Sequence, residues 1–175
     1  MIKLLDSNLK VSQISVTKIC EEANVTRSTF YAHFSIPEDI IKEIENELLS
    51  KFAKLVFIAN WKGTDIIINF LKEVKANSKL YKVFLLNLEN SSFQNKIIQK
   101  SYLAFDYLKK QYINTSNHEL IIHYIIGGNI NILRYWVGTN FKKSEQEIAD
   151  LIIRVSKSTI ATFIDQKRKI VFNAD

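Results

Sequence analysis

The chain has 175 residues, of which 47% are hydrophobic, so it is long and apolar enough to bury a sizeable core. One proline and four glycines favour long uninterrupted helices, and we expect an all-α fold. The single cysteine excludes an internal disulfide framework and a cysteine-based metal site. The net charge of +6 is uneven, because residues 1–52 sum to −2 and residues 1–34 to only +1. Any anion bound by the N-terminal region must therefore be held by placed donors rather than by bulk positive charge.

After a short first helix within residues 1–9, residues 15–34 predict two helices joined by a tight turn. Ser15 suits the N-cap of the first, because a serine hydroxyl accepts a hydrogen bond from an otherwise unpaired backbone N–H. Asn24 should end it, since asparagine enters left-handed backbone geometry at low cost. Val25 should fill the angle between the helices, and Thr26 should cap the second. The expected apolar face of the first helix is Val16, Ile19, Cys20 and Ala23.

The second helix of this pair should turn Phe30 and Phe34 inward and short polar groups outward. A polar outer face on the second helix of a helix-turn-helix is the arrangement that meets a DNA groove. An ordinary surface helix pair is the alternative. The outward residues are Arg27, Ser28, Thr29, Tyr31 and His33.

Residues 16–41 resemble the N-terminal signature of tetracycline-repressor (TetR) family transcriptional regulators, roughly I-T-V-x-x-I-A-x-x-A-G-V-S-x-G-T-F-Y-x-H-F-x-x-K-x-x-L. Asn24 replaces the turn glycine. Pro37 replaces the lysine that usually opens the fourth helix near the phosphate backbone. The matching positions are Ile14, Val16, Ile19, Ala23, Val25, Thr26, Thr29, Phe30, Tyr31, His33, Phe34 and Ile40.

The resemblance implies a three-helix DNA-binding head in residues 1–45 and a helical regulatory and dimerisation domain in residues 46–175. It also implies a homodimer that binds a near-palindromic double-stranded DNA operator, acting as a repressor that a small-molecule effector can release. The DNA-binding residues expected on this basis are Thr26, Arg27, Ser28, Thr29, Tyr31, His33 and Lys42.

The rest of the chain predicts further helices with brief breaks. A long fourth helix over residues 37–61 would reach roughly 36 Å at 1.5 Å per residue and would connect the two domains. Helices should follow at residues 65–77, from residue 78, and at about 93–112, before a loop at 114–117. Apolar residues recur at helical spacing in each of them.

The last two helices carry the dimer prediction. The helix at about 118–137 is apolar nearly all round, so it must be covered on both sides. Gly127 and Gly128 each cost about 1 kcal/mol relative to alanine, which close approach of another backbone would offset. Ser144 and Glu147 should form a capping box at the start of the last helix. The expected outcome is a four-helix bundle between two copies, with packing inside a monomer as the alternative. The expected interface is Ile121, Ile125, Gly127, Gly128, Ile132, Ile148, Ile152, Val155 and Thr159.

Two further inferences concern this C-terminal half. The glycine pair, the tryptophan at 136 and the start of the final helix resemble a TetR subgroup that includes dihydroxyacetone-kinase-type regulators. The resemblance to TetR regulators also implies an effector pocket, although aromatic residues at helical spacing equally form a plain core. An effector should tilt the long fourth helix and change the spacing of the heads. The candidate lining residues are Tyr102, Phe105, His123, Tyr124 and Trp136.

Catalytic chemistry finds little support in the sequence. Three histidines and one cysteine give no nucleophile and base at recognisable spacing, and neither a glycine-rich phosphate loop nor a metal-ligand cluster is visible. We therefore expect no enzyme activity, no catalytic residue, no cofactor and no metal. The N-terminus has no signal-peptide pattern and no apolar segment is long enough for a membrane span, so we expect a cytoplasmic protein. The alternative function is a TetR-fold protein that acts through a protein partner with no small-molecule effector, which the near-neutral head and Pro37 keep open.

Overall fold

The structure is a computed structural model, and it describes residues 1–6, 11–58, 64–86, 93, 95–97, 99 and 118–163. All regular structure in these residues is helical, which confirms the all-α prediction. The predicted helix at 93–112 lies mostly outside them, and the loop at 114–117 lies wholly outside them. The elements are α1 (Ile2–Asp6), the 3-10 helix η1 (Val11–Gln13), α2 (Val16–Ala23), α3 (Arg27–His33), α4 (Pro37–Ile58), α5 (Thr64–Ala76), α6 (Ser78–Leu86), α8 (His118–Gly138) and α9 (Glu145–Phe163).

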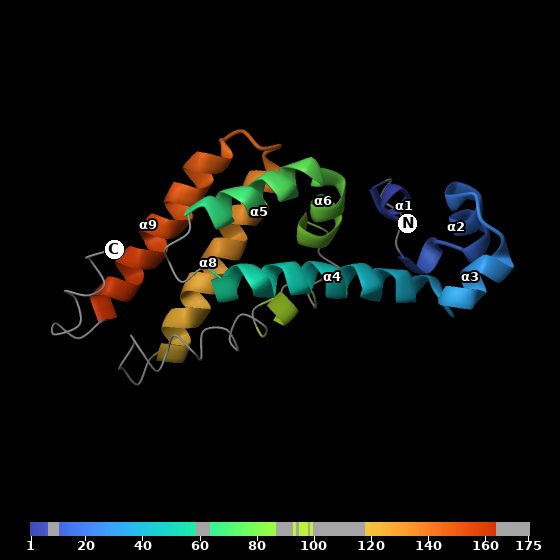
Figure 1. The fold of residues 1–175 in the computed structure, drawn as a ribbon, viewed down its shortest axis with the longest axis horizontal. Helices are drawn as coiled ribbons and strands as arrows, with labels where there is room; N and C mark the ends of the chain where they lie inside the picture. The colour runs from blue at the N-terminus through green and yellow to red at the C-terminus, as the bar shows by residue number, and fades with distance from the viewer. Residues whose placement is uncertain are drawn as a thin grey trace.

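The helices gather at two ends of an elongated molecule, and α4 runs between them (Figure 1). Helices α1, α2 and α3 lie at one end, and α5, α8 and α9 lie at the other. Helix α4 has 22 residues, which corresponds to about 33 Å, close to the predicted length. Helix α1 contacts α6, so the N-terminal end also touches the body directly.

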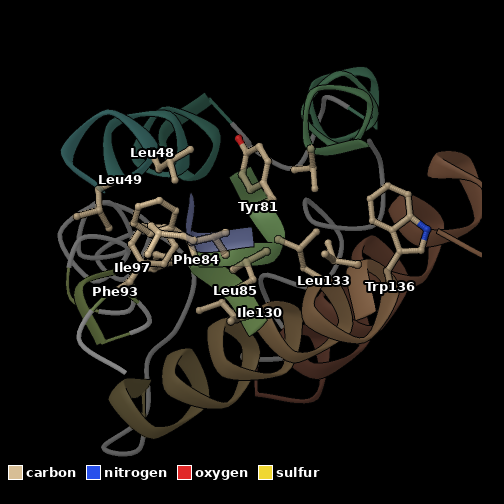
Figure 2. Close-up of a cluster of buried hydrophobic side chains, with 14 of the residues drawn as sticks. Leu48, Leu49, Tyr81, Phe84, Leu85, Phe93, Ile97, Ile130, Leu133 and Trp136 are labelled. Carbon is tan, nitrogen blue, oxygen red and sulfur yellow. The ribbon is translucent and has the colours of Figure 1, made fainter. Parts of the chain in front are cut away.

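A single hydrophobic core runs from the N-terminal helices into the body. It includes Leu4 and Leu5 of α1, Phe30 of α3, and most of the buried apolar side chains of α4, α6 and α8. Figure 2 shows the part between α4, α6 and α8, where the rings of Phe84 and Phe93 lie 5.2 Å apart. The labelled members are Leu48, Leu49, Tyr81, Phe84, Leu85, Phe93, Ile97, Ile130, Leu133 and Trp136.

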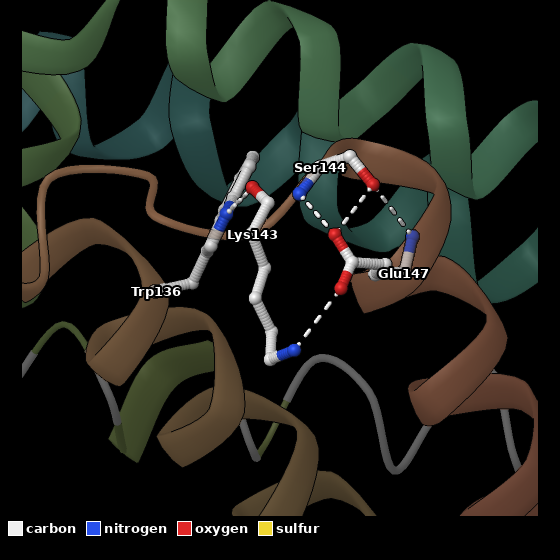
Figure 3. Close-up of polar contacts among 4 residues, drawn as sticks. All are labelled: Trp136, Lys143, Ser144 and Glu147. Carbon is white, nitrogen blue, oxygen red and sulfur yellow. Dashed lines mark hydrogen bonds and ion pairs between the residues drawn. The ribbon is translucent and has the colours of Figure 1, made fainter.

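The turn between α8 and α9 is fixed by the predicted capping box and by Trp136 (Figure 3). The Ser144 backbone N–H donates to Glu147 Oε2 at 2.8 Å, and the Glu147 N–H donates to Ser144 Oγ at 3.2 Å. The indole N–H of Trp136 donates to the Lys143 carbonyl at 2.7 Å. The left-handed residues of this turn are Asn140 and Phe141, with φ of 57° and 59°, and they follow the helix end at Gly138.

Candidate nucleic-acid interface

The two helices of the head have the capping geometry that the sequence predicts. The Ser15 hydroxyl accepts from the Lys18 N–H at 3.2 Å at the start of α2. Asn24 ends α2 in the left-handed region, with φ 53° and ψ 48°. The Thr26 hydroxyl accepts from the Thr29 N–H at 3.1 Å at the start of α3. Three local hydrogen-bonding choices within twelve residues therefore set the angle between α2 and α3.

The interior of the head differs from the prediction at two positions. Phe30 is buried as expected, and Phe34 is half-buried against the core. Val25 keeps 40% of its surface exposed, so the expectation that it fills the angle between the helices is wrong. Ala23 is exposed as well. The buried residues of the head around α2 and α3 are instead Ile14, Ile19, Cys20 and Phe30.

The hydroxyl groups at the start of α3 form one cluster. Thr26 Oγ1 lies 2.9 Å from both Ser28 Oγ and Thr29 Oγ1, in addition to its bond from the Thr29 N–H. A hydroxyl has one donor and two acceptor sites, so the Thr26 side chain is fully used inside the protein. Ser28 and Thr29 are exposed beside it. The role of Thr26 is therefore to cap α3 and to orient its two neighbours.

The larger polar side chains of α3 face solvent, as predicted. Tyr31 is 59% exposed, and its ring meets buried Phe30 edge-on at 5.3 Å, which holds the phenol outward. His33 is exposed at the end of the helix. Arg27 is exposed too, and its Nη2 donates to Thr17 Oγ1 on α2 at 2.6 Å. Thr17 was not among the predicted residues, because its link to Arg27 spans ten positions and joins two helices.

The start of α4 is occupied by its own carboxylate. Asp39 Oδ2 accepts from the Ile36 and Ser35 backbone N–H groups, both at 3.0 Å, and these bonds lower the pKa of Asp39. Asp39 Oδ1 also lies 3.4 Å from the ammonium of Lys42. Lys42 is exposed, as a DNA-contacting residue must be, but it stands beside this opposite charge. Backbone N–H groups before a helix suit a phosphate, and here two of them already have an acceptor.

The other exposed feature is apolar and lies on α8 and α9. Leu120, Tyr124 and Tyr135 are 67%, 66% and 73% exposed, and their spacing places them along one face of α8. Gly127 and Gly128 lie on the same face, and a Cβ added to either would meet no heavy atom of the described residues within 4 Å. Helix α9 packs beside α8, with Asn129 Nδ2 donating to Ser156 Oγ at 3.1 Å, and exposes Leu151 and Val155. We use the name α8/α9 face for the exposed apolar residues and open glycines of these two helices, namely Leu120, Tyr124, Gly127, Gly128, Tyr135, Leu151 and Val155.

Residues 60–158 match a TetR-type family model described as the transcriptional regulator C-terminal region. The match covers more than half of the chain. The chain belongs to the TetR family of transcriptional regulators. The matched segment lies outside the helix-turn-helix, so the C-terminal match and the N-terminal geometry are independent observations. Comparison with curated proteins and with solved structures gives no significant match.

The dimer prediction for this TetR-family regulator needs correction at three positions. Ile121, Ile125 and Ile148 are buried inside the chain, so they are not available to a second copy in this conformation. A helix that is apolar all round has two apolar sides, and the side of α8 with Ile121 and Ile125 is the buried one. The remaining predicted residues are the open Gly127 and Gly128, exposed Val155, and half-buried Ile132, Ile152 and Thr159.

The predicted effector-pocket residues do not come together in the described part of the chain. Tyr102 and Phe105 lie outside it. Tyr124 lies on the α8/α9 face, and His123 is also exposed, so both point away from the interior. Trp136 is buried, and its indole N–H is used by the turn before α9. Because Tyr102 and Phe105 lie outside the described residues, the grouping of these five residues in one pocket stays a prediction.

Two further features bear on the class of protein. None of the helices in the described ranges is both long and apolar enough to cross a membrane. Those ranges also hold no group of three or more His, Cys, Asp or Glu side chains arranged to bind a metal ion.

Proposed function

We propose that this TetR-family regulator is a transcriptional repressor that binds a near-palindromic DNA operator as a homodimer. The observation that carries the proposal is the exposed polar face of α3, presented by a helix-turn-helix whose caps are all satisfied. Arg27 and Ser28 would read base edges in the major groove, and Thr29, Tyr31 and His33 would hold the phosphate backbone. Thr26 contributes by orienting its neighbours, and Lys42 adds a charge at the rim.

The low net charge of the head favours DNA binding through hydrogen bonds from placed donors over binding through bulk positive charge. The first 34 residues sum to +1, so few condensed counterions would be released on binding. A head of this kind gains its affinity from hydrogen bonds in fixed places and from having two copies of them. We therefore expect modest affinity for random DNA and a clear preference for the operator.

The second copy would dock on the α8/α9 face. This face combines large exposed apolar side chains with two glycines that nothing in the described chain covers. Large exposed apolar patches commonly mark interfaces, and glycines permit close approach of another helix. Pairing around a twofold axis would set two heads on one DNA face, with half-sites about 34 Å apart. On this proposal the division into residues 1–45 and 46–175 falls within α4, which joins the two parts.

Fluorescence anisotropy with labelled duplexes from the region upstream of the chain's own gene tests the proposal. Sedimentation velocity on the same samples gives the number of chains per duplex. We expect a saturable complex of two chains that weakens with salt and that prefers one imperfect palindrome. A chain that stays monomeric at micromolar concentration and shows no preference among upstream duplexes would contradict it.

Release by an effector would act through α4. Among the described residues, two ion pairs join this helix to the body: Glu45 Oε2 with Lys96 Nζ at 2.7 Å, and Lys51 Nζ with Glu73 Oε1 at 2.8 Å. A small molecule in the body that moved these partners would shift the head that α4 carries. Added effector should then lower operator affinity without dissociating the dimer.

A protein-partner regulator is the second candidate, and the start of α4 favours it. Pro37 stands where a lysine is usual, and Asp39 takes two N–H groups that suit a phosphate. Both features weaken backbone contacts. This candidate predicts a stable dimer that binds upstream duplexes no better than random ones, so the anisotropy measurement separates the two functions.

A further inference from the structure

We infer that Thr17, at the start of α2, positions the guanidinium of Arg27 and thereby helps to set the base preference of the head. The inference rests on the proposed function, because it assigns a specificity role within the same interface. The observation behind it is the hydrogen bond from Arg27 Nη2 to Thr17 Oγ1 at 2.6 Å. It is the side-chain hydrogen bond between α2 and α3 in the described part of the chain.

The geometry makes this bond an orienting contact. Arg27 is the first residue of α3, and Thr17 is the second residue of α2, so the arginine side chain runs back along the neighbouring helix. Thr17 is half-buried, and its branched side chain has few rotamers in a helix. Its hydroxyl therefore has few positions, and in the structure it accepts from Arg27. A long exposed side chain that is held at its tip in this way has lost part of its freedom before DNA arrives.

Anchoring leaves Arg27 able to read a base. A guanidinium has five N–H donors in one plane, and Thr17 takes one of them. The other edge keeps the paired donors that recognise the two acceptor atoms of guanine in the major groove. A side chain that is already oriented loses less entropy on binding than a free one. Thr17 thus acts through Arg27, as a positioning residue.

The base preference of Thr17→Val tests this role. Valine keeps the shape of threonine and removes the acceptor. Every operator base pair is substituted in turn, and binding of each duplex is measured by anisotropy for the wild type and the variant. A good bidentate contact discriminates roughly 5- to 150-fold between bases. We expect Thr17→Val to lose about three- to tenfold of that discrimination at one symmetric pair of positions, with binding to random DNA unchanged.

Three matched variants separate positioning from a general structural effect. Thr17→Ser keeps the hydroxyl and should keep the wild-type preference. Thr17→Ala also removes the acceptor, with less bulk, and should lose the same discrimination between bases. It replaces Thr17→Val in the test if valine disturbs folding. Thr17→Val in an Arg27→Ala background should change nothing further, because the group that it positions is gone. Thermal unfolding of each variant confirms that the head is folded.

The outcomes distinguish the inference from the function beneath it. If the wild type binds its operator selectively and Thr17→Val keeps the full base preference, the positioning role is wrong and the repressor stands. A loss spread evenly over all positions would also overturn it, since that indicates a phosphate contact or a damaged head. If the wild type shows no selectivity for any duplex, the proposed function fails and the inference fails with it.

Discussion

The head and the α8/α9 face are both exposed, but they differ in chemistry and in what holds their side chains. The head presents polar groups on the seven-residue helix α3, and most of them are held by a contact within the head: a cap, a ring edge or the bond to Thr17. The α8/α9 face presents large apolar groups on helices of 21 and 19 residues, and no described part of the chain covers them. The head is thus complete within one chain, whereas on the proposed function a second copy would complete the face. Substitutions should therefore act on binding geometry in the head and on assembly at the face.

Gly128→Glu should have the largest effect, because it places a charge on the α8/α9 face, between Tyr124 and Tyr135 along α8. Within one chain the new side chain has open space, and glutamate is a better helix former than glycine, so the monomer should stay folded. Loss of the second head removes the avidity of a bivalent complex, and operator affinity should fall about 100-fold or more. Sedimentation velocity and anisotropy measure the two consequences.

Asn69→Glu is the matched control for that variant. It adds the same charge at an exposed position of α5, outside the α8/α9 face, and should leave both the dimer and the operator affinity unchanged. A dimer that survives Gly128→Glu with full affinity would show that the second copy docks elsewhere.

The next largest effects on DNA binding are expected from two substitutions in α3, which should differ in kind. Arg27→Ala should remove the discrimination at one base position, worth about 1–3 kcal/mol. Tyr31→Phe deletes only an exposed hydroxyl and keeps the ring contact with Phe30, so it should weaken binding to every duplex about two- to tenfold, without a change in thermal stability. Competition with substituted operators measures both. Equal losses on all sequences for Arg27→Ala would place this residue on the backbone instead of a base.

These contrasts also explain which parts of the molecule could be predicted from sequence. The caps Ser15, Asn24 and Thr26 act on groups within a few residues, so local chemistry was enough to place the helix-turn-helix. Which side of α8 is buried and which is exposed depends on how the neighbouring helices pack against it. Its pattern offered Ile121 and Ile125 as readily as Leu120 and Tyr124, and only the packed chain decides between them. Thr17 was missed for a similar reason, since its partner lies on another helix.

Asp39→Asn should produce a smaller change of opposite sign. The variant removes a negative charge beside the end of α4 that would face DNA on the proposed function, frees Lys42 and weakens the acceptor for the Ser35 and Ile36 N–H groups. Operator affinity at low salt should rise a few-fold. The slope of log K against log salt should become steeper by up to about 0.9, the amount expected for one additional phosphate contact. Glu43→Gln removes the same charge from an exposed site one turn further on, without those hydrogen bonds. If both variants raise operator affinity equally, the cause is the change in net charge and not the loss of the Asp39 hydrogen bonds.

The smallest expected effect concerns stability at low pH and tests the body alone. Hydrogen bonds from the Ser144 backbone N–H and from Lys143 lower the pKa of Glu147 to about 2. A carboxyl whose pKa is lower in the folded state stabilises the fold above its unfolded pKa, near 4.5, and this stabilisation is lost as the pH falls towards 2. The Tm of the wild type should therefore fall more steeply between pH 4.5 and 2 than the Tm of Glu147→Gln, while the two slopes match between pH 6 and 7. Because the capping box lies far from α3, operator affinity at neutral pH should be the same for both proteins, and a change in base preference would show that the start of α9 is coupled to the head.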